Sequence, residues 1–462
     1  MPRSWNKALL LGFLTVLCAA AEPVDWLVSA RWIVTMDAQR HVYENASIAV
    51  KGNQILAVGP RAALAAKYQA RQKLDAGNAI LAPGLINTHT HAAMSLFRGI
   101  ADDMKLQDWL EKFIFPAEAK NVTAEFVRWG TRLACLEMLQ SGTTTYADMY
   151  YFEEVVGEAT REAGMRGILG QTIIRFPVPD AKTPVEGLKR AEAFLQRFQD
   201  DQLIVAAVAP HAVYTNDDET LQAARTLANK YKAPYLIHLS ETKKENDDLM
   251  ASRHLSPTQL LQKLGALDGR TLAAHGVWIS DDDRQILISH NTGIAHCPSS
   301  NMKLASGVAD VVKYLKLDAA LGLGTDGVAG SNNDVNMFEE MDLAAKLAKV
   351  TTGDPTAVNA EQAFEMATIR GARAIQMEKE IGSLEPGKRA DWISVSLAEA
   401  NAQPLYNVYS QLVYALKGSD VRDVMVNGRM VVRNRRVLTL NAPEILLKAA
   451  EYQKRIKESL SH

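Results

Sequence analysis

The sequence predicts an α/β protein whose main part is a (β/α)₈ TIM barrel, joined to a small β-sandwich domain built from both chain ends. Two observations support this. Apolar strand-like segments alternate with segments of helical periodicity through the middle of the chain, and nearly every such strand ends in a His, Asp or Glu. Barrel enzymes build their sites at the carboxyl ends of the strands, so the pattern favours a barrel over the runner-up, a doubly wound sheet.

Length and composition indicate a folded protein of enzyme size. The chain has 462 residues, of which 47% are hydrophobic and 23% are charged, and its net charge is -2. This composition argues against disorder. The sequence carries no basic stripe, so we expect no nucleic-acid partner. No glycine-rich phosphate-binding motif follows a strand, which argues against nucleotide-phosphate binding.

Residues 1–21 have the pattern of a secretory signal peptide. Arg3 and Lys7 precede a short apolar run, and a triplet of alanines ending at Ala21 fits a cleavage site. The run is too short for a comfortable membrane span. We therefore expect a periplasmic or secreted protein with no stable membrane association after cleavage. If the start codon is misassigned, the protein would instead be cytoplasmic.

Residues 22–78 and 382–440 are rich in short β segments, and we expect them to form the composite β-sandwich domain. Asn427-Gly428 is a strong hairpin signal between two of these segments. Residues 441–462 are expected to form a C-terminal helix. The strands predicted for this domain lie at 28–35, 47–58 with a turn at 51–54, 391–395, 421–426 and 430–437.

Residues 79–381 are expected to form the barrel. Its predicted strands are residues 80–91, 143–148, 167–174, 203–211, 235–241, 271–278, 293–297 and 320–326. Helical periodicity lies between them, at residues 127–139, 183–198, 218–231 and 257–264.

Side chains that can bind a metal ion or transfer a proton lie at the ends of the predicted strands. His89 and His91 are two residues apart, so on a strand they point to the same face. Neutral imidazole is the commonest metal ligand, and the pair therefore predicts part of a metal site. The other residues at or just beyond strand ends are Asp148, His211, His238, Glu241, His275, His296 and Asp326.

Five sequence motifs resemble those of the amidohydrolase superfamily. They lie at residues 83–91, 238–242, 297–307, 324–327 and 382–391. Within that superfamily the chain is similar to the mononuclear deaminases of the methylthioadenosine/S-adenosylhomocysteine type and to their triazine-hydrolase relatives. The resemblance covers about residues 26–440.

The resemblance implies one divalent metal ion, with Zn²⁺ as the first choice. Its ligands would be His89, His91, His238 and Asp326, with a further position left for water. Zinc lowers the pKa of such a water to about 7. Fe²⁺ and Mn²⁺ can use the same ligands. No lysine ends a middle strand, which favours one metal ion over the two that a carboxylated lysine would bridge.

The resemblance also implies roles for the catalytic residues. Glu241 would shuttle a proton from water to the substrate ring and then to the leaving ammonia. His275 would orient or polarise the water, and Asp326 could also accept its proton. General acid–base catalysis of this kind raises the reaction rate by a factor of about 10²–10⁴. An alternative interpretation makes Glu241 a helix-capping carboxylate.

Substrate contacts are implied for three more residues besides Glu241. Glu118 would accept hydrogen bonds from the ribose hydroxyls, His211 would bind the purine or the sugar, and Arg175 would approach the substrate tail. Glu118 could instead be a solvated carboxylate at a helix start. Asp148 has no predicted role, and His296 with Cys297 is expected to lie behind the metal ligands.

The leading functional prediction is hydrolytic deamination of S-adenosylhomocysteine or 5'-methylthioadenosine to the inosyl product and ammonia. The nearest alternative is a triazine chlorohydrolase, followed by a guanine or pterin deaminase and, remotely, a catalytically inactive binding protein. Chloride leaves without a proton whereas ammonia needs one, so Glu241 favours deamination. The expected binding partner is then a small nucleoside substrate. The resemblance to the family also implies that the protein forms a homo-oligomer.

Overall fold

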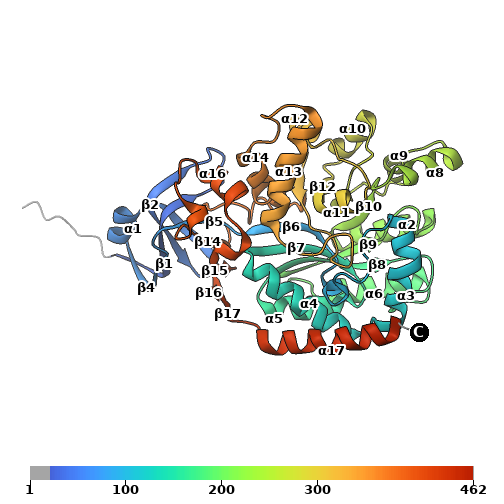
Figure 1. Cartoon of the computed structure of the whole chain (residues 1–462), viewed down its shortest axis with the longest axis horizontal. Coiled ribbons are helices and arrows are strands. Elements are labelled where there is room, and N and C mark those ends of the chain that lie inside the picture. The colour runs from blue at the N-terminus through green and yellow to red at the C-terminus, as the bar shows by residue number, and fades with distance from the viewer. Residues whose placement is uncertain (1–20, 461–462) are drawn as a thin grey trace, which may run out of the picture.

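The structure, a computed structural model, describes residues 21–460 and consists of two β-sheets with their helices (Figure 1). The predicted signal peptide lies outside the described residues except for Ala21. The first strand begins directly after it, at Glu22.

A nine-stranded mixed sheet contains strands from both ends of the chain, which confirms the small composite domain. Strand β1 pairs with β4 along its first half and with β5 along its second half, so the sheet branches there. Val28, Ile48 and Trp392 are buried in one apolar cluster of this domain. The strands are β1 (Glu22–Val34), β2 (Val42–Lys51), β3 (Gln54–Pro60), β4 (Tyr68–Asp75), β5 (Ala79–Pro83), β14 (Trp392–Ser396), β15 (Val421–Val426), β16 (Arg429–Arg433) and β17 (Arg436–Val437).

The strand expected at 80–91 is in fact two strands that belong to different sheets. β5 pairs with β1 and β14 of the mixed sheet, whereas β6 (Leu85–Thr90) pairs with the first neighbouring strand of the barrel. Gly84 separates them, and a Cβ at Gly84 would lie 2.2 Å from the Thr144 side chain. The barrel strands therefore begin at Leu85 and not at residue 79.

The barrel prediction is confirmed by a second sheet of eight parallel strands in chain order from β6 to β13. Its two outer strands meet: the Thr88 hydroxyl donates to the carbonyl of Leu323 at 2.8 Å, and the Asp326 amide donates to the carbonyl of His89 at 2.9 Å. After β6 the strands are β7 (Thr143–Tyr150), β8 (Arg166–Ile173), β9 (Ile204–Pro210), β10 (Tyr235–Leu239), β11 (Thr271–His275), β12 (Gly293–His296) and β13 (Leu321–Leu323).

Helices cover the outside of the barrel, and polar residues cap most of them. Thr123, Thr183 and Asp217 accept hydrogen bonds from first-turn amides of α4, α6 and α7. The longer α-helices are α4 (Ala124–Gln140), α5 (Glu153–Ala163), α6 (Pro184–Arg197), α7 (Asp218–Tyr231), α8 (Lys243–Arg253), α10 (Asp281–Ser289), α13 (Met337–Thr352) and α17 (Ala442–Leu460).

Shorter helices connect these elements. The α-helices among them are α1 (Arg61–Lys67), α2 (Leu106–Asp108), α3 (Phe115–Asn121), α9 (Pro257–Lys263), α11 (Pro298–Lys303), α12 (Val311–Lys316), α14 (Ala360–Met366), α15 (Ile369–Ala374) and α16 (Val408–Ser410). The 3₁₀ and π segments are η1 (Ala92–Phe97), η2 (Trp109–Ile114), η3 (Ala400–Ala402), η4 (Gln411–Ala415) and η5 (Gly418–Asp420).

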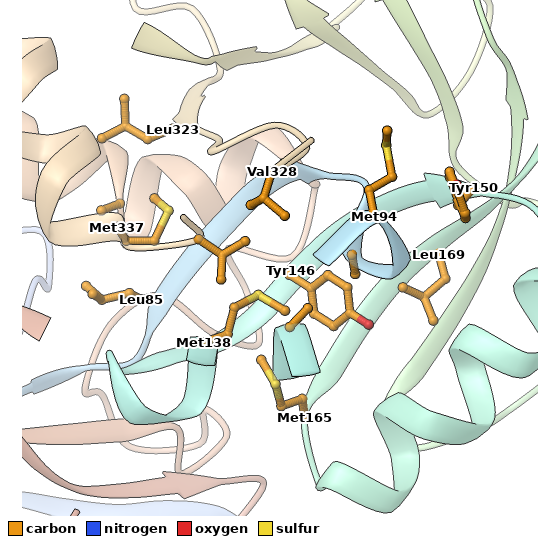
Figure 2. Packing of buried hydrophobic residues seen from close by; sticks show 14 of the residues in the cluster. Leu85, Met94, Met138, Tyr146, Tyr150, Met165, Leu169, Leu323, Val328 and Met337 are labelled. Atoms are coloured by element: carbon orange, nitrogen blue, oxygen red, sulfur yellow. The ribbon is translucent and has the colours of Figure 1, made fainter. Parts of the chain in front are cut away.

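A continuous apolar core packs around the barrel strands. Figure 2 shows Leu85, Tyr146, Leu169 and Leu323 of the barrel strands gathered with helix residues such as Met138, and all of them are buried in one cluster. Large, well-packed apolar side chains of this kind hold the strand ends in fixed positions.

Helix α17 runs along the outside of the barrel, as Figure 1 shows. Its buried side chains are Ile445, Tyr452 and Ile456, and the Tyr452 ring lies 5.6 Å from that of Phe126 on α4. Within residues 21–460, no helix has both the length and the apolar character needed to cross a membrane.

Candidate metal centre and active site

The four predicted metal ligands come together at the carboxyl ends of β6, β10 and β13. One oxygen of Asp326 lies 3.3 Å from Nε2 of His89 and 3.3 Å from Nε2 of His91. The Nε2 atoms of His91 and His238 are also 3.3 Å apart. Atoms that bond a zinc ion at about 2.0–2.2 Å lie about 3.3–3.5 Å apart in a tetrahedron, so this spacing suits a small divalent cation.

Hydrogen bonds orient two of the imidazoles. Nδ1 of His91 donates to the carbonyl of Met149 at 2.7 Å, and Nδ1 of His238 donates to the carbonyl of His211 at 2.8 Å. In the neutral rings both Nε2 lone pairs therefore face each other. The buried Nε2 of His89 has no hydrogen-bond partner among the described residues. A cation between these atoms would remove the lone-pair repulsion, so the residues fit a bound metal ion.

Asp326 is positioned by a side chain of α11 and by the backbone of its own loop. Ser300 donates to its second oxygen at 2.7 Å, and the Gly327 amide donates to the first at 2.7 Å. Burial opposes ionisation, but the imidazoles of His89 and His91 beside it hold the pKa of the Asp326 carboxyl well below its usual value. Its φ of 63° turns the chain three residues after the end of β13. The carboxylate is thus ionised and fixed, as a metal ligand must be.

Glu241 and His275 face each other beside this cluster. Their nearest side-chain atoms, Oε2 and Nε2, are 3.7 Å apart. Nδ1 of His275 donates to Oδ1 of Asn301 at 3.0 Å, which leaves Nε2 as the basic nitrogen. Ser306 donates to Oε1 of Glu241 at 3.2 Å. Burial raises the pKa of the Glu241 carboxyl, while the neighbouring His275 acts in the opposite direction.

Glu118, on α3, lines the same buried chamber as His91, His238 and Asp326, here called the inner chamber. It is 4% exposed and accepts hydrogen bonds from the hydroxyls of Tyr150 at 2.7 Å and Tyr151 at 3.3 Å. Burial raises the pKa of Glu118 to about 7, although both tyrosine hydroxyls act in the opposite direction. It is not the solvated carboxylate of the alternative interpretation.

His211 lies in the inner chamber, and burial lowers its pKa to about 3, so its ring is neutral. Its ring centroid is 4.6 Å from that of His238. Arg175 does not line the inner chamber. It lines an outer cleft of about 870 Å³ that shares Leu110, Phe115 and Tyr214 with the chamber.

Several contact residues were missed by the sequence analysis. Tyr150 and Tyr151 lie two and three residues beyond the predicted strand at 143–148, and this position was the available signal. Ser300, Asn301 and Ser306 lie within the motif at 297–307, but a motif does not reveal which side chain each member contacts.

Two other residues at strand ends support the site. Asp148, left without a role above, accepts hydrogen bonds from the Thr90 hydroxyl at 2.5 Å and the Ala92 amide at 2.6 Å, and so braces the chain on both sides of His91. Among the described residues two groups could hold a metal ion, His89 with His238 and His275, and His89 with His91 and Asp326. His296 is buried and belongs to neither.

The family profile and similar curated proteins indicate the same family. The profile of the amidohydrolase family matches residues 80–431. The chain is 42% identical over 436 residues to the 5-methylthioadenosine/S-adenosylhomocysteine deaminase of Thermodesulfovibrio yellowstonii, covering 94% of this chain and 99% of that protein. It is 44% identical over 439 residues to 5-methylthioadenosine/S-adenosylhomocysteine deaminase 1 of Syntrophus aciditrophicus, covering 95% and 99% respectively.

Solved structures show the same architecture. The crystal structure of an adenosine deaminase from Xanthomonas campestris with bound zinc superposes with a TM-score of 0.92 at 36% identity, covering 95% of this chain and 100% of that chain. An atrazine chlorohydrolase from Arthrobacter aurescens, complexed with zinc, has a TM-score of 0.84 at 22% identity, covering 93% and 100%. At that identity the second likeness concerns the fold alone.

Proposed function

The chain belongs to the amidohydrolase family and is a hydrolase that acts on C–N bonds, and from this we propose that it deaminates an adenosine-type nucleoside. The substrate would be S-adenosylhomocysteine or 5'-methylthioadenosine, and the products the inosyl compound and ammonia. One observation carries this choice: Glu118, a buried acceptor suited to ribose hydroxyls, shares a chamber with Glu241 and with three of the proposed metal ligands, His91, His238 and Asp326.

A divalent metal ion, for which we propose zinc, would be held by His89, His91, His238 and Asp326 and would supply a Lewis acid that makes water nucleophilic at neutral pH. Zinc bound to the Xanthomonas relative supports that choice. His275 would accept a hydrogen bond from the attacking water at Nε2, because its Nδ1 proton is engaged by Asn301.

Glu241 would carry the proton. Its carboxylate takes a proton from the attacking water as the C6–O bond forms, and delivers it to N1 of the purine ring. As the C6–N bond breaks, the second proton of that water passes through Glu241 to the amino group, which leaves as ammonia. Ring N1 keeps its proton in the inosyl product, so the atoms of one water are accounted for.

The two parts of the cleft suit the two parts of such a substrate. The inner chamber, with Met149, Thr172 and Trp109 beside the polar residues, would take the base and the ribose. The outer cleft, with Arg175, would take the 5' substituent. We further propose that the protein works in the periplasm on scavenged nucleosides; cell fractionation that finds the full-length chain in the cytosol would contradict this location.

The test is ammonia release by the metal-loaded chain across a panel of substrates. We expect turnover of S-adenosylhomocysteine, 5'-methylthioadenosine or adenosine, with kcat/KM at least about a hundredfold above that for guanine, pterins and chlorotriazines. Preferential turnover of a base without ribose would overturn the assignment of Glu118, and dechlorination of a triazine as the main activity would overturn the reaction class.

A further inference from the structure

The chain makes an abrupt turn between β10 and the proton-carrying Glu241. β10 ends at Leu239, and Ser240 has a φ of 50°, a left-handed conformation that costs energy for a residue with a Cβ. This turn directs Glu241 back towards His275. Something in the surrounding structure has to hold it in place.

One side of the turn is held by the loop after β11. The carbonyl of Ser240 accepts hydrogen bonds from the amides of Val277 at 3.1 Å and Trp278 at 2.9 Å. The other side is held by a side chain: the Glu241 amide donates to Oε2 of Glu245 at 3.0 Å. Glu245 is 7% exposed and sits in the first turn of α8.

This contact departs from the usual arrangement at a helix start. In a capping box the third residue of the helix accepts the amide proton of the N-cap residue, as Gln259 does for Ser256 at α9. In α8 the N-cap is Thr242, yet Glu245 binds the amide one residue earlier, at Glu241. The shifted cap joins the backbone of Glu241 to α8.

We propose that Glu245 is a positioning residue for the deamination, which holds the backbone of Glu241 so that its carboxylate faces the reacting atoms. The inference rests on the proposed function for its kinetic consequences only. Burial raises the pKa of Glu245 to about 8, so at neutral pH its carboxyl is protonated and glutamine matches it in shape. Oε1, where glutamine would carry its NH₂ group, has no protein partner among the described residues.

The experiment compares four variants of the full metal-loaded chain. Glu245→Ala should lower kcat about 10–100-fold, because a misplacement of about 1 Å can cost about a hundredfold, while KM and metal content stay within about threefold of wild type. Glu245→Gln should retain kcat within about threefold. Gln259→Ala, which breaks the corresponding cap on α9, should retain full kcat. Glu245→Asp, too short to reach the amide, replaces the alanine variant if that one does not fold and should show the same loss.

A second readout does not depend on activity. Hydrogen exchange of the peptide that contains residues 239–243 should be at least about tenfold faster in Glu245→Ala than in wild type or Glu245→Gln. Wild-type kcat and unchanged exchange in the alanine variant would overturn the inference, as would an equal loss of kcat in Gln259→Ala. If wild type releases no ammonia from any nucleoside, the proposed function fails, and the exchange measurement still decides whether Glu245 holds the turn.

Discussion

At the scale of single residues, the site depends on imidazole nitrogens whose hydrogen-bond partners are defined. The imidazoles of His91 and His238 are held at Nδ1 by backbone carbonyls, and His275 is held by Asn301. These contacts fix which nitrogen is free to bind a metal ion or water. The two carboxyls Glu241 and Glu118 are buried in the same chamber, but they face different neighbours and would do different work.

Glu241→Gln should keep the metal ion and lose most turnover. The amide retains the size and can still accept from Ser306, but it cannot carry a proton. We expect kcat to fall at least about a thousandfold, with metal content unchanged by elemental analysis. Near-normal ammonia release from this variant would show that the proton travels by another route.

Glu118 should make substrate capture depend on pH. Its pKa of about 7 means that below pH 7 the carboxyl is protonated and loses acceptor capacity, while above pH 7 both oxygens can accept from the ribose. The ionised fraction of such a group rises roughly tenfold between pH 6 and pH 8, and kcat/KM reports the pKa of the free enzyme.

The measurement for this prediction is the pH profile of kcat/KM with a ribonucleoside. We expect a rise through pH 7 in wild type and no such rise in Glu118→Gln, whose overall kcat/KM should be lower. A profile that keeps the same rise in the glutamine variant would assign it to another group.

At the scale of elements, most of the fold could be predicted because periodicity and strand-end chemistry are local signals. The eight barrel strands and helices α4, α6, α7 and α9 lie where the pattern indicates. The division of 80–91 into β5 and β6 was missed, although Pro83-Gly84 is a turn signal between the two parts. Which sheet each part joins could not be predicted, because that depends on their partners, β14 and β7. Pairing between strands that are distant in the sequence, such as β5 and β14, is not visible in the local hydrophobic pattern.

Helix α17 offers a test of element packing with an internal control. Ile456 is 3% exposed, whereas Leu447 on the same helix is 60% exposed. Ile456→Ala should destabilise the fold by about 2–5 kcal/mol, and Leu447→Ala by no more than about 0.5 kcal/mol. Urea unfolding measures both; equal midpoints for the two variants would mean that α17 does not pack on the barrel in this way.

At the scale of the whole molecule, the barrel brings together residues that are more than two hundred positions apart in the sequence. His89 lies on β6 and Asp326 just beyond β13, the two outer strands. Closure of the barrel places Nε2 of His89 3.3 Å from Oδ1 of Asp326. The proposed ligand set could be named from the sequence only through the resemblance of its motifs to those of a known family, because several other residues also lie at strand ends. The contacts of Tyr150, Tyr151 and Glu245 could not be predicted, because they depend on how loops from different strands meet.

Metal binding should stabilise the folded chain as a whole. A ligand at about a hundred times its dissociation constant adds about 2.7 kcal/mol to the free energy of unfolding. Thermal unfolding of chelator-treated protein should therefore occur at a lower temperature than that of the zinc-loaded protein. His238→Ala should lose most of this difference, and an undiminished shift in that variant would place the stabilising metal elsewhere.

The most direct test of the central claim is turnover of S-adenosylhomocysteine and 5'-methylthioadenosine by the zinc-loaded chain in ¹⁸O-labelled water, followed by mass spectrometry and ammonia assay. The account predicts that each turnover releases one ammonia and one inosyl product carrying a single ¹⁸O on the purine ring. Recovery of both nucleosides unchanged, under conditions in which a triazine or a free purine base is consumed, would contradict it.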